Sequence, residues 1–429
     1  MQHLLELYNY FLSTGKVSTD TRNDVSESVF FALSGANFNG NEYAKYALDN
    51  GAILAVIDQK EHDLGDGYFL VKDSLKTLQE LAGLHRSKMK CQVIGITGSN
   101  GKTTTKELIA SVLSTERKIN FTKGNLNNHI GVPLTILSIE SDTEIAIVEM
   151  GANHKGEIAL LCDIAQPEFG IITNIGKAHL EGFGSFDGVI EAKSELYDFL
   201  KSSNGTVFVN QNDSLLMDLS KKIKRTTYGS NSKLFKAEIK KSKPFLNINW
   251  EYKNHNYLCR TKLFGQYNAD NINAAIATGL YFGISPGNIN TAIANYQPDN
   301  NRSQLLKTEI NLLILDAYNA NPVSMSKAIE NFIDYQPNNP WLILGDMFEL
   351  GETSLEEHEK IIDILKESPF KNVLLVGKDF FRIRSNNSFV SFSNLKDADK
   401  YIAKHPIKNA EILVKGSRGI ELEKLLKYL

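Results

Sequence analysis

The feature that most constrains the fold of this chain is the run Thr97-Gly98-Ser99-Asn100-Gly101-Lys102-Thr103. It follows a short apolar stretch, 93–96, and leads into a predicted helix over 104–113. A glycine-bearing turn between a strand and a helix directs backbone N–H groups at a phosphate. Lysine adds a charge for the β- and γ-phosphates, and a threonine hydroxyl suits Mg²⁺. The run therefore predicts an α/β unit that binds a nucleotide.

The match to the usual P-loop is incomplete. That loop carries a glycine six residues before its lysine, where this chain has Ile96. The alternative interpretation is a glycine-rich turn that only caps a helix. The strand–turn–helix context around Gly101, Lys102 and Thr103 favours phosphate binding.

Composition excludes several classes of protein. A net charge of -3 and a pI near 6.3 argue against a general nucleic-acid binder. The three cysteines, Cys91, Cys162 and Cys259, form neither a metal-type spacing nor a disulfide framework, which favours a reducing cytoplasm. The N-terminus lacks the pattern of a signal peptide, and no apolar run reaches membrane-spanning length. We therefore expect a cytoplasmic protein that does not insert into a membrane.

A chain of 429 residues is long enough for roughly two to four domains, and three units are predicted. The first, 1–88, is a small α/β domain with strands and a helix that begins at Ser74 as its N-cap. Its strands are predicted at 29–33, 52–57 and 68–71, and its helix at 74–88.

The second and third units alternate apolar strands with helical patterns, which predicts mainly parallel sheets. The central domain, 89–302, also contains an alternating apolar and polar stretch, 234–264, typical of an antiparallel meander. The C-terminal domain, 303–429, reads as a second, Rossmann-like doubly wound α/β domain. Strands are predicted at 118–121, 144–150, 170–174, 206–210, 311–316, 341–345, 373–377 and 412–415, and a helix at 268–281.

Polar residues follow several strands of the central domain, where open α/β sheets bind ligands. Glu149 ends one strand and could bind the Mg²⁺ that accompanies phosphates; alone it would be a surface carboxylate. His179 lies beyond the next strand, as a metal ligand or as a hydrogen-bonded loop residue. Lys193 lies on a predicted helix, and without other context it would be a solvated lysine.

Four further clusters of polar residues have the same placement after strands. The segment 122–128 is either a solvated turn or a binding loop for a polar substrate or phosphate oxygens. The segment 316–325 carries Pro322 near the first turn of the next helix, as proline prefers. Its polar residues at the end of a strand indicate a site, and a loop that only caps the helix is the alternative. The segments 344–351 and 415–418 repeat this placement, the latter with two cations suited to an anion.

Together these motifs resemble the Mur ligases, ATP-dependent amide-forming enzymes of peptidoglycan synthesis. The shortened loop 97–103 is the form shared by that superfamily, folylpolyglutamate synthases included. The segments 316–325, 344–351 and 415–418 resemble most the members that add D-alanyl-D-alanine. The N-terminal Asp20-Thr21-Arg22 and the segment 30–41 are similar to the family's UDP-sugar-binding domain.

The resemblance implies a role for each matching residue. ATP and one or two Mg²⁺ ions are the implied cofactors, and UDP-N-acetylmuramoyl-tripeptide and D-Ala-D-Ala the implied substrates of a monomer. Lys193 matches a lysine that many members carry as a carbamate. The implied nucleotide contacts are Gly98, Ser99, Asn100, Gly101, Lys102, Thr103, Thr104, Asn268, Asn271, Arg302, Asp316 and Tyr318. The implied metal ligands are Thr103, Glu149, His179 and Lys193, and the catalytic set is Lys102, Lys193, His179 and Arg302. The implied substrate contacts are Asp20, Arg22, Gly35, Asn41, Asn125, Asn127, Asn128, Asn319 and Asn321.

Two positions depart from the family pattern. Tyr267 stands where members often have histidine, and Asn39-Gly40-Asn41 where they often have Asp-Gly-His. The implied reaction joins the tripeptide carboxylate to D-Ala-D-Ala through an acyl phosphate. Another Mur-type or folylpolyglutamate-type ligase, a P-loop switch ATPase and a UDP-sugar-binding module are the alternatives. The third residue of the tripeptide, diaminopimelate or lysine, stays open.

Overall fold

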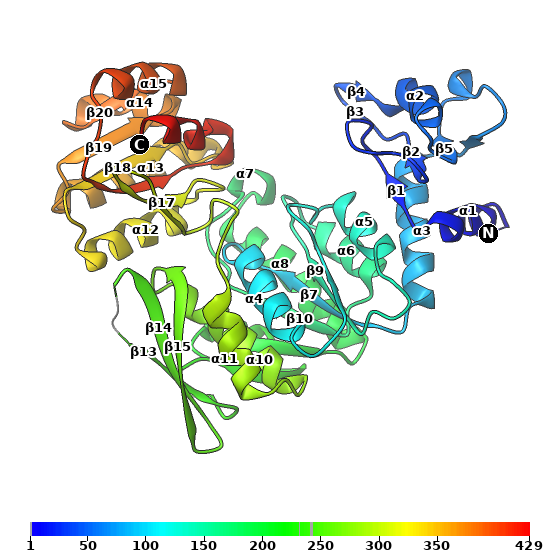
Figure 1. Ribbon diagram of the computed structural model, residues 1–429, viewed down its shortest axis with the longest axis horizontal. Helices are drawn as coiled ribbons and strands as arrows, with labels where there is room; N and C mark the ends of the chain where they lie inside the picture. Colours follow the sequence, from blue (N-terminus) through cyan, green and yellow to red (C-terminus); the bar gives the residue numbers. More distant parts are fainter. Residues whose placement is uncertain (1, 231, 241–242) are drawn as a thin grey trace.

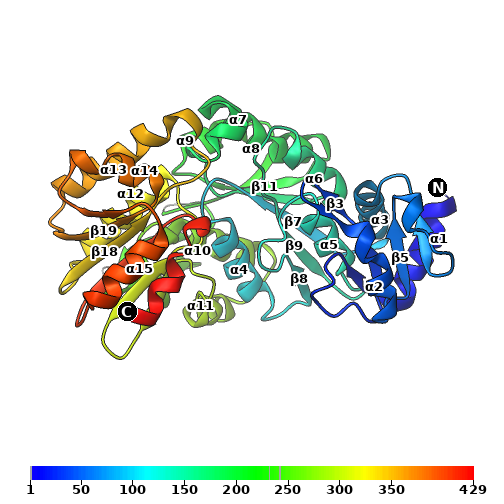
Figure 2. The same ribbon diagram turned by 90° about the horizontal axis from the view of Figure 1, so that it is seen from above.

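The computed structural model describes residues 2–230, 232–240 and 243–429. The chain folds into three α/β units, and the N- and C-terminal units lie at opposite ends of the middle one (Figures 1 and 2). The predicted α/β class with three units is confirmed, while the boundaries at 88 and 302 stay predictions.

The N-terminal unit is a four-stranded parallel sheet in the order β1-β2-β5-β6, with a small hairpin, β3-β4, beside it. The helix α3 matches the predicted range, but the predicted N-cap is wrong. The side chain of Asp73, rather than Ser74, accepts the hydrogen bond from the backbone N–H of Lys76, and Ser74 is buried in the first turn. The elements are α1 (Gln2–Thr14), β1 (Val17–Ser18), β2 (Val29–Phe31), β3 (Ser34–Gly35), β4 (Phe38–Asn39), η1 (Gly40–Tyr43), α2 (Ala44–Asp49), β5 (Leu54–Ile57), η2 (Lys60–His62), β6 (Tyr68–Leu70) and α3 (Ser74–Lys88).

The middle unit has a six-stranded sheet, all parallel, in the order β12-β11-β10-β7-β9-β8. Its central strands are buried at almost every position because helices cover both faces, so they are continuously apolar. Its elements are β7 (Gln92–Thr97), α4 (Lys102–Leu113), β8 (Ile119–Phe121), α5 (Gly131–Leu137), β9 (Ile145–Glu149), α6 (Glu157–Ala165), β10 (Phe169–Ile172), α7 (Leu180–Phe183), α8 (Phe186–Ser202), β11 (Thr206–Asn210), α9 (Ser214–Leu219), β12 (Lys224–Tyr228), α10 (Asn268–Tyr281) and α11 (Pro286–Asn295).

A three-stranded antiparallel sheet interrupts the middle unit, as the alternating pattern at 234–264 predicts. It consists of β13 (Lys236–Lys240), β14 (Phe245–Tyr252) and β15 (His255–Phe264). Trp250 of β14 is fully buried against Phe235 and Tyr257. The sheet lies below the main body of the middle unit in Figure 1.

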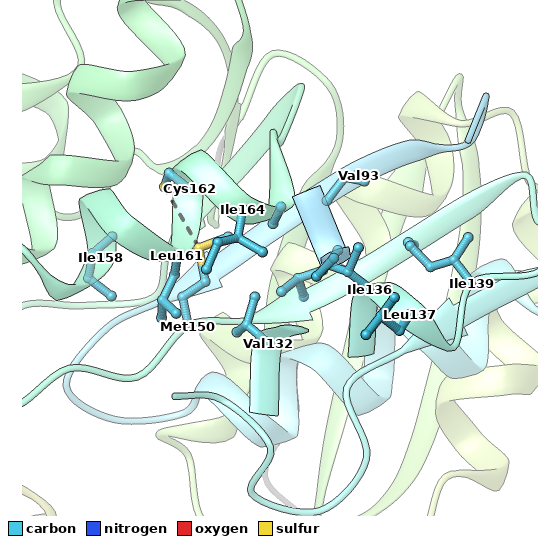
Figure 3. Close-up of a cluster of buried hydrophobic side chains, with 14 of the residues drawn as sticks. Val93, Val132, Ile136, Leu137, Ile139, Met150, Ile158, Leu161, Cys162 and Ile164 are labelled. Atoms are coloured by element: carbon cyan, nitrogen blue, oxygen red, sulfur yellow. Dashed lines mark hydrogen bonds between the residues drawn. The ribbon is translucent and has the colours of Figure 1, made fainter. Parts of the chain in front are cut away.

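The core beneath the middle sheet is a close-packed apolar cluster (Figure 3). Val93 of β7 and Met150 after β9 lie in it beside residues of α5 and α6, and the Cys162 thiol lies 3.8 Å from the Met150 sulfur. The same cluster continues through α3 to Leu7 and Phe11 of α1. The first two units therefore share a continuous core, which stabilises their mutual placement.

The C-terminal unit is a six-stranded sheet in the order β16-β17-β21-β18-β19-β20. It is parallel except at β16, an antiparallel edge strand that the sequence pattern did not indicate. Its elements are β16 (Gln304–Lys307), β17 (Leu312–Asp316), α12 (Pro322–Tyr335), β18 (Pro340–Gly345), η3 (Gly351–Thr353), α13 (Ser354–Glu367), β19 (Asn372–Val376), α14 (Lys378–Arg382), η4 (Arg384–Asn386), β20 (Val390–Phe392), α15 (Leu395–Lys404), β21 (Glu411–Lys415), η5 (Arg418–Ile420) and η6 (Leu422–Tyr428).

No helix among the described residues is both long and apolar enough to span a membrane.

Candidate active site

A cavity of about 810 Å³ lies where the middle and C-terminal units meet. The carboxyl ends of strands from both parallel sheets border it, which is where open α/β sheets bind ligands. The residues of the sequence prediction that line it are Ser99, Asn100, Gly101, Lys102, Thr103, Thr104, Asn125, Asn127, Asn128, Glu149, His179, Asn268, Asn271, Arg302, Asp316, Tyr318 and Asn319. Segments 200 residues apart in the sequence therefore meet at one site.

Two glycines give the loop after β7 its shape. Gly101, at φ +81°, precedes the first turn of α4, and Gly98 has φ +143°. A Cβ at Gly98 would lie 2.0 Å from Thr173 Oγ1, and one at Gly101 would lie 2.6 Å from Asn271 Oδ1. Only glycine fits both the left-handed backbone and this close approach.

The loop is held by the segment that follows β10. The Asn100 N–H donates to Asn174 Oδ1 at 3.0 Å, while the Asn100 carbonyl accepts from Asn174 Nδ2 and from the Thr173 hydroxyl. Ser99 Oγ donates to the Gly176 carbonyl at 2.9 Å. These contacts fix the N-terminus of α4 toward the cavity, as a phosphate-binding turn requires.

Lys102 is the first residue of α4, and its side chain folds back over the loop. Its Nζ donates to the Gly98 carbonyl at 2.7 Å. Burial lowers the pKa of Lys102, while the nearby Glu149 carboxylate opposes that shift. A cation held over a glycine turn at a helix N-terminus is suited to the terminal phosphates of a nucleotide.

Glu149, the last residue of β9, is 1 % exposed. Its Oε1 accepts from the Thr103 hydroxyl at 3.1 Å and from Asn127 Nδ2 at 2.8 Å. Its Oε2 is buried, has no hydrogen bond with any residue that the structure describes, and lies 3.7 Å from Lys106 Nζ. The structure thus brings together three of the predicted residues, Thr103, Asn127 and Glu149.

This arrangement fits a divalent cation. A carboxylate and a hydroxyl are the hard oxygen ligands that Mg²⁺ binds, usually beside phosphates. A buried carboxylate oxygen left without a donor is the kind of atom for which a bound ion provides an explanation. Glu149 and Thr103 are therefore suited to hold Mg²⁺.

Lys193 is not the solvated lysine that its sequence context alone would suggest. It lies on the inner face of α8 and is 1 % exposed, with Nζ 5.4 Å from the centre of the Phe183 ring. Burial lowers the pKa of Lys193 to about 7, and the charge of Lys102 contributes in the same direction. The neutral amine, which this shift favours near neutral pH, is the form of lysine that reacts with CO₂.

His179 precedes α7 in a left-handed backbone conformation, at φ +53°. Its Nδ1 lies against a carboxylate oxygen of Glu349, which comes from the C-terminal unit. This contact holds the pKa of Glu349 below its ordinary value. The His179 ring also lies edge-on to Phe183, the ring that Lys193 faces.

Asn268 and Asn271, two of the implied nucleotide contacts, lie in the first turn of α10. Both are buried, and Asn271 Nδ2 donates to Asn268 Oδ1 at 2.9 Å. Thr105 Oγ1 of α4 donates to Asn271 Oδ1 at 3.0 Å. The pair therefore links α10 to the phosphate-binding helix.

Tyr267, at the position where the family often has histidine, also borders the cavity. Its hydroxyl contacts Ser303 Oγ, and burial raises its pKa. Within the described residues it thus joins α10 to the segment that begins the C-terminal unit.

Arg302 stacks its guanidinium on the Tyr318 ring, 3.7 Å from the centroid. Its Nε is buried and has no hydrogen-bond partner among the described residues. Asp316 ends β17 and pairs with Lys415 Nζ at 2.5 Å, and Lys415 also reaches the Asn319 carbonyl at 3.4 Å. A cation and an aromatic ring on one wall suit the phosphates and base of a nucleotide.

Asn321 caps α12 and also bridges the units. Its side chain accepts from the Ser324 N–H, and the two residues form a capping box that was not predicted from the sequence. Pro322 lies in the first turn, as predicted. Its Nδ2 donates to Asn100 Oδ1 of the loop at 2.8 Å. Gly98, Lys193 and Asn321 lie around the cavity without lining it.

The four residues predicted to bind the UDP-sugar lie in the N-terminal unit and do not line the cavity. Asp20 and Arg22 form an exposed ion pair at 2.7 Å, which lowers the pKa of Asp20 to about 2. Gly35 is exposed in the β3-β4 hairpin. Asn41 is buried, and its amide bonds to Ser34, Asn39 and Asp58, so it shapes the loop from within.

Sequence reasoning missed three residues of this site. Lys106 lies behind Glu149, fully buried, and donates to the Thr122 carbonyl at 2.8 Å. Asn174 positions the loop, and Glu349 contacts His179. Lys106 lies one helical turn after Lys102 on a helix with few exposed positions, which is the one signal that could have indicated its burial.

Comparison with known protein families gives two matches. The description "Mur ligase middle domain" matches residues 96–279, and "Mur ligase, glutamate ligase domain" matches residues 301–418.

Individual relatives match over nearly the full chain. The UDP-N-acetylmuramoyl-tripeptide--D-alanyl-D-alanine ligase of Bacillus subtilis (strain 168) is 33% identical over 96% of this chain and 92% of its own length. The protein of the same name from Escherichia coli (strain K12) is 32% identical over 99% and 95%.

Solved structures show the same similarity. The crystal structure of MurF from Acinetobacter baumannii superposes with a TM-score of 0.87 at 30% identity, covering 96% of this chain and 92% of that one. The MurF ligase of Thermotoga maritima, in complex with ADP, gives 0.84 at 27% identity and 97% coverage of both chains. A folylpolyglutamate synthase of the same organism, at 13% identity and a TM-score of 0.62, shares the fold alone.

Proposed function

Because the chain belongs to the Mur ligase family, we propose that it is the ligase that joins D-alanyl-D-alanine to the terminal carboxylate of UDP-N-acetylmuramoyl-tripeptide. ATP is consumed, and UDP-N-acetylmuramoyl-pentapeptide, ADP and phosphate are the products. The reaction is a step in the synthesis of peptidoglycan precursors.

The first step is attack of the tripeptide carboxylate on the γ-phosphorus of ATP. A carboxylate oxygen–phosphorus bond forms, the bond to the ADP oxygen breaks, and an acyl phosphate results. Two anions must approach each other, so cationic groups fixed beforehand lower the barrier. Lys102 at the loop and Arg302, which also lines the cavity, supply this charge.

In the second step the free amine of D-Ala-D-Ala attacks the acyl carbon. The amide bond forms, phosphate leaves with its electron pair, and the amine loses a proton to solvent or a nearby base. Four asparagines of the two substrate loops line the cavity and are suited to hold peptide groups there: Asn125, Asn127 and Asn128 of the middle unit and Asn319 of the C-terminal unit. Asn321 would position the phosphate loop beside them through its bond to Asn100.

Mg²⁺ would be held by Thr103, Glu149 and His179, and when bound it neutralises phosphate charge. The orphaned Oε2 of Glu149 supports this assignment. The burial of Lys193 and its pKa of about 7 support a carbamate, which would convert a cation into an anionic ligand.

We assign one role to each unit. Residues 1–88 bind the UDP-sugar end, 89–302 bind ATP, and 303–429 bind the amino substrate and close over the nucleotide. The enzyme acts as a monomer in the cytoplasm, in keeping with three free, buried cysteines.

The single observation that carries the proposal is the joining of the phosphate loop to the C-terminal unit through Asn100 and Asn321. A P-loop switch ATPase or a UDP-sugar-binding module would not require a second α/β unit docked onto the phosphates. The folylpolyglutamate synthase shares the fold at only 13% identity, so its substrate is not proposed for this chain.

The test is ADP release with UDP-N-acetylmuramoyl-tripeptide and D-Ala-D-Ala, each omitted in turn. Turnover that needs both substrates is expected, with pentapeptide appearing in equal amount to ADP. ADP release indifferent to the two substrates would contradict the proposal.

A further inference from the structure

A contact between His179 and Glu349 beside the cavity joins the middle unit to the C-terminal unit. His179 Nδ1 contacts a carboxylate oxygen of Glu349, and the Glu181 N–H donates to the Glu349 carbonyl at 3.4 Å. Lys177 Nζ lies 3.6 Å from Glu357, whose side chain is buried. The segment around α7 is therefore held by two contacts to Glu349 in the loop after β18 and by one to Glu357 of α13.

The contact with Glu349 uses Nδ1 of the His179 ring and leaves Nε2 free to bind a metal ion. A carboxylate accepts hydrogen bonds, so a neutral imidazole in this contact carries its proton on Nδ1, facing Glu349. Nε2 then carries the lone pair that a metal binds. Histidines that bind metals usually donate their other N–H to a carboxylate in this way, which fixes the tautomer and the ring orientation.

Both residues of the contact have unusual backbones. His179 has φ +53° and Glu349 has φ +63°, each in the left-handed region that non-glycine residues rarely occupy. Such strain persists where the surrounding structure enforces it, and it gathers at functional sites. The two turns aim the side chains at each other across the boundary of the units.

We propose that Glu349 is a positioning residue for the metal site: it holds His179 in the tautomer and orientation that presents Nε2 to the ion. This inference rests on the proposed function, in which His179 is a metal ligand. Glu349 belongs to the C-terminal unit, so His179 is held in this tautomer only when that unit is docked. Docking and metal binding are thereby linked, and phosphoryl transfer is restricted to the closed enzyme.

The first test measures Mn²⁺ binding by the full-length protein at saturating ADP, with free Mn²⁺ followed by electron paramagnetic resonance. Glu349→Ala is expected to weaken Mn²⁺ binding tenfold to a hundredfold at one site, the usual effect of losing such a partner. Glu349→Gln keeps a side-chain oxygen that can accept from Nδ1, so it is expected to weaken binding less. Glu352→Gln, in the same loop and exposed, is the matched control and is expected to bind as the wild type does.

The second variant pair decides whether Glu349 acts through His179. In a His179→Ala background, Glu349→Ala is expected to cause no further loss of Mn²⁺ affinity. Additive losses would overturn the inference, as would Mn²⁺ binding by Glu349→Ala within twofold of the wild type.

The tautomer gives a readout that does not depend on metal or activity. ¹⁵N NMR of the histidine rings is expected to show His179 protonated at Nδ1 in the wild type and in Glu349→Gln, and a mixture of tautomers in Glu349→Ala. Protonation at Nε2 in the wild type would overturn the inference.

The ligase assay separates this inference from the proposed function. Substrate-dependent ADP release with unaltered Mn²⁺ binding in Glu349→Ala removes the role of Glu349 and leaves the ligase in place. Unaltered Mn²⁺ binding in His179→Ala removes both the ligand assignment and this inference.

Discussion

Lys102 is the residue on which phosphoryl transfer depends most. Its ammonium lies over the loop and opposes the charge that develops between two anions. Lys102→Ala is expected to slow ligation roughly a thousandfold, about 4 kcal/mol of barrier. Steady-state ADP release gives the measurement, and Lys201→Ala, an exposed lysine of α8, is the control. Near-normal turnover in Lys102→Ala would refute this role.

Lys193 tests the carbamate. Lys193→Ala is expected to lose activity because it removes the anionic group, and a small carboxylate such as acetate is expected to restore part of it by occupying the vacated space. ADP release with and without added acetate measures this. Full activity of the variant without acetate would show that Lys193 has no catalytic part.

At the residue scale, local patterns were the ones that the sequence could reveal. Lys102 and Thr103 follow from the spacing of glycines around them, and Glu149 from its place at a strand end. The burial of Lys193 and the partner of His179 could not be predicted in this way. Both depend on how distant elements pack in space. Lys193 is covered by the packing of α8, and Glu349 lies 170 residues beyond His179 in the sequence.

The turn between β7 and α4 depends on Gly98. In Gly98→Ala the new Cβ would meet Thr173 Oγ1 at 2.0 Å, and the backbone at φ +143° resists a side chain. Nucleotide affinity is expected to fall more than tenfold while the fold persists, since the strain is local. Titration with a fluorescent ATP analogue, beside thermal unfolding, measures both.

Gly287→Ala in α11 is the matched control for that variant, because no atom lies within 4 Å of its new Cβ. It is expected to keep wild-type affinity. Equal affinities of the Gly98 and Gly287 variants would contradict the assigned shape of the loop.

His85 of α3 fastens the first unit to the second. Its Nδ1 accepts from the Tyr8 hydroxyl of α1 at 3.1 Å, and its Nε2 donates to the Ile139 carbonyl beyond α5 at 2.9 Å. Burial lowers the pKa of His85 below its ordinary 6.5. Below about pH 6.5 the unfolded chain therefore binds a proton at this histidine more readily than the folded chain does. The free energy of unfolding falls as the pH falls through this range.

His85→Gln removes this titration while it keeps a donor and an acceptor. Between pH 7 and pH 5, the slope of the free energy of unfolding against pH is expected to be smaller than in the wild type. The difference in slope is at most about 1.4 kcal/mol per pH unit. Urea unfolding across this range measures the slope. His255→Gln, at an exposed histidine, is expected to keep the wild-type slope, and an unchanged slope in His85→Gln would contradict the assignment.

At the element scale, the predicted elements that the structure confirms are long or strongly apolar. The helices α3 and α10 and the strand β11 match their predicted ranges. Short edge strands escaped prediction: β12 carries Lys224 and Arg225, and β20 has three residues. Edge strands have one pairing side and little burial, so their sequences lack the apolar signal that central strands carry.

At the scale of the whole molecule, the middle and C-terminal units meet through polar contacts around a cavity, which predicts movement. Spin labels at Lys201→Cys and Lys366→Cys report it, because the native cysteines are buried. A broad distance distribution is expected without ligand, and a narrower one with a non-hydrolysable ATP analogue and tripeptide substrate. One narrow distribution under both conditions would show that the units do not move.

The sequence predicted the three units and their order along the chain, but it did not predict the side-chain contacts between them. Asn321 illustrates the difference: its capping role is local and readable, but its bond to Asn100 depends on docking of two separate sheets. The roles of Asp20 and Asn41 in the N-terminal unit were predicted only from the family resemblance. In the structure Asp20 forms an ion pair with Arg22, and Asn41 belongs to an internal hydrogen-bond network.

The central claim is that a peptide carboxylate, rather than water, receives the γ-phosphate of ATP. The most direct measurement uses UDP-N-acetylmuramoyl-tripeptide labelled with ¹⁸O in its terminal carboxylate and analyses the released phosphate by mass spectrometry. One labelled oxygen per phosphate is predicted, since the acyl phosphate transfers that oxygen when the amide forms. Phosphate free of label, with pentapeptide still produced, would contradict the account.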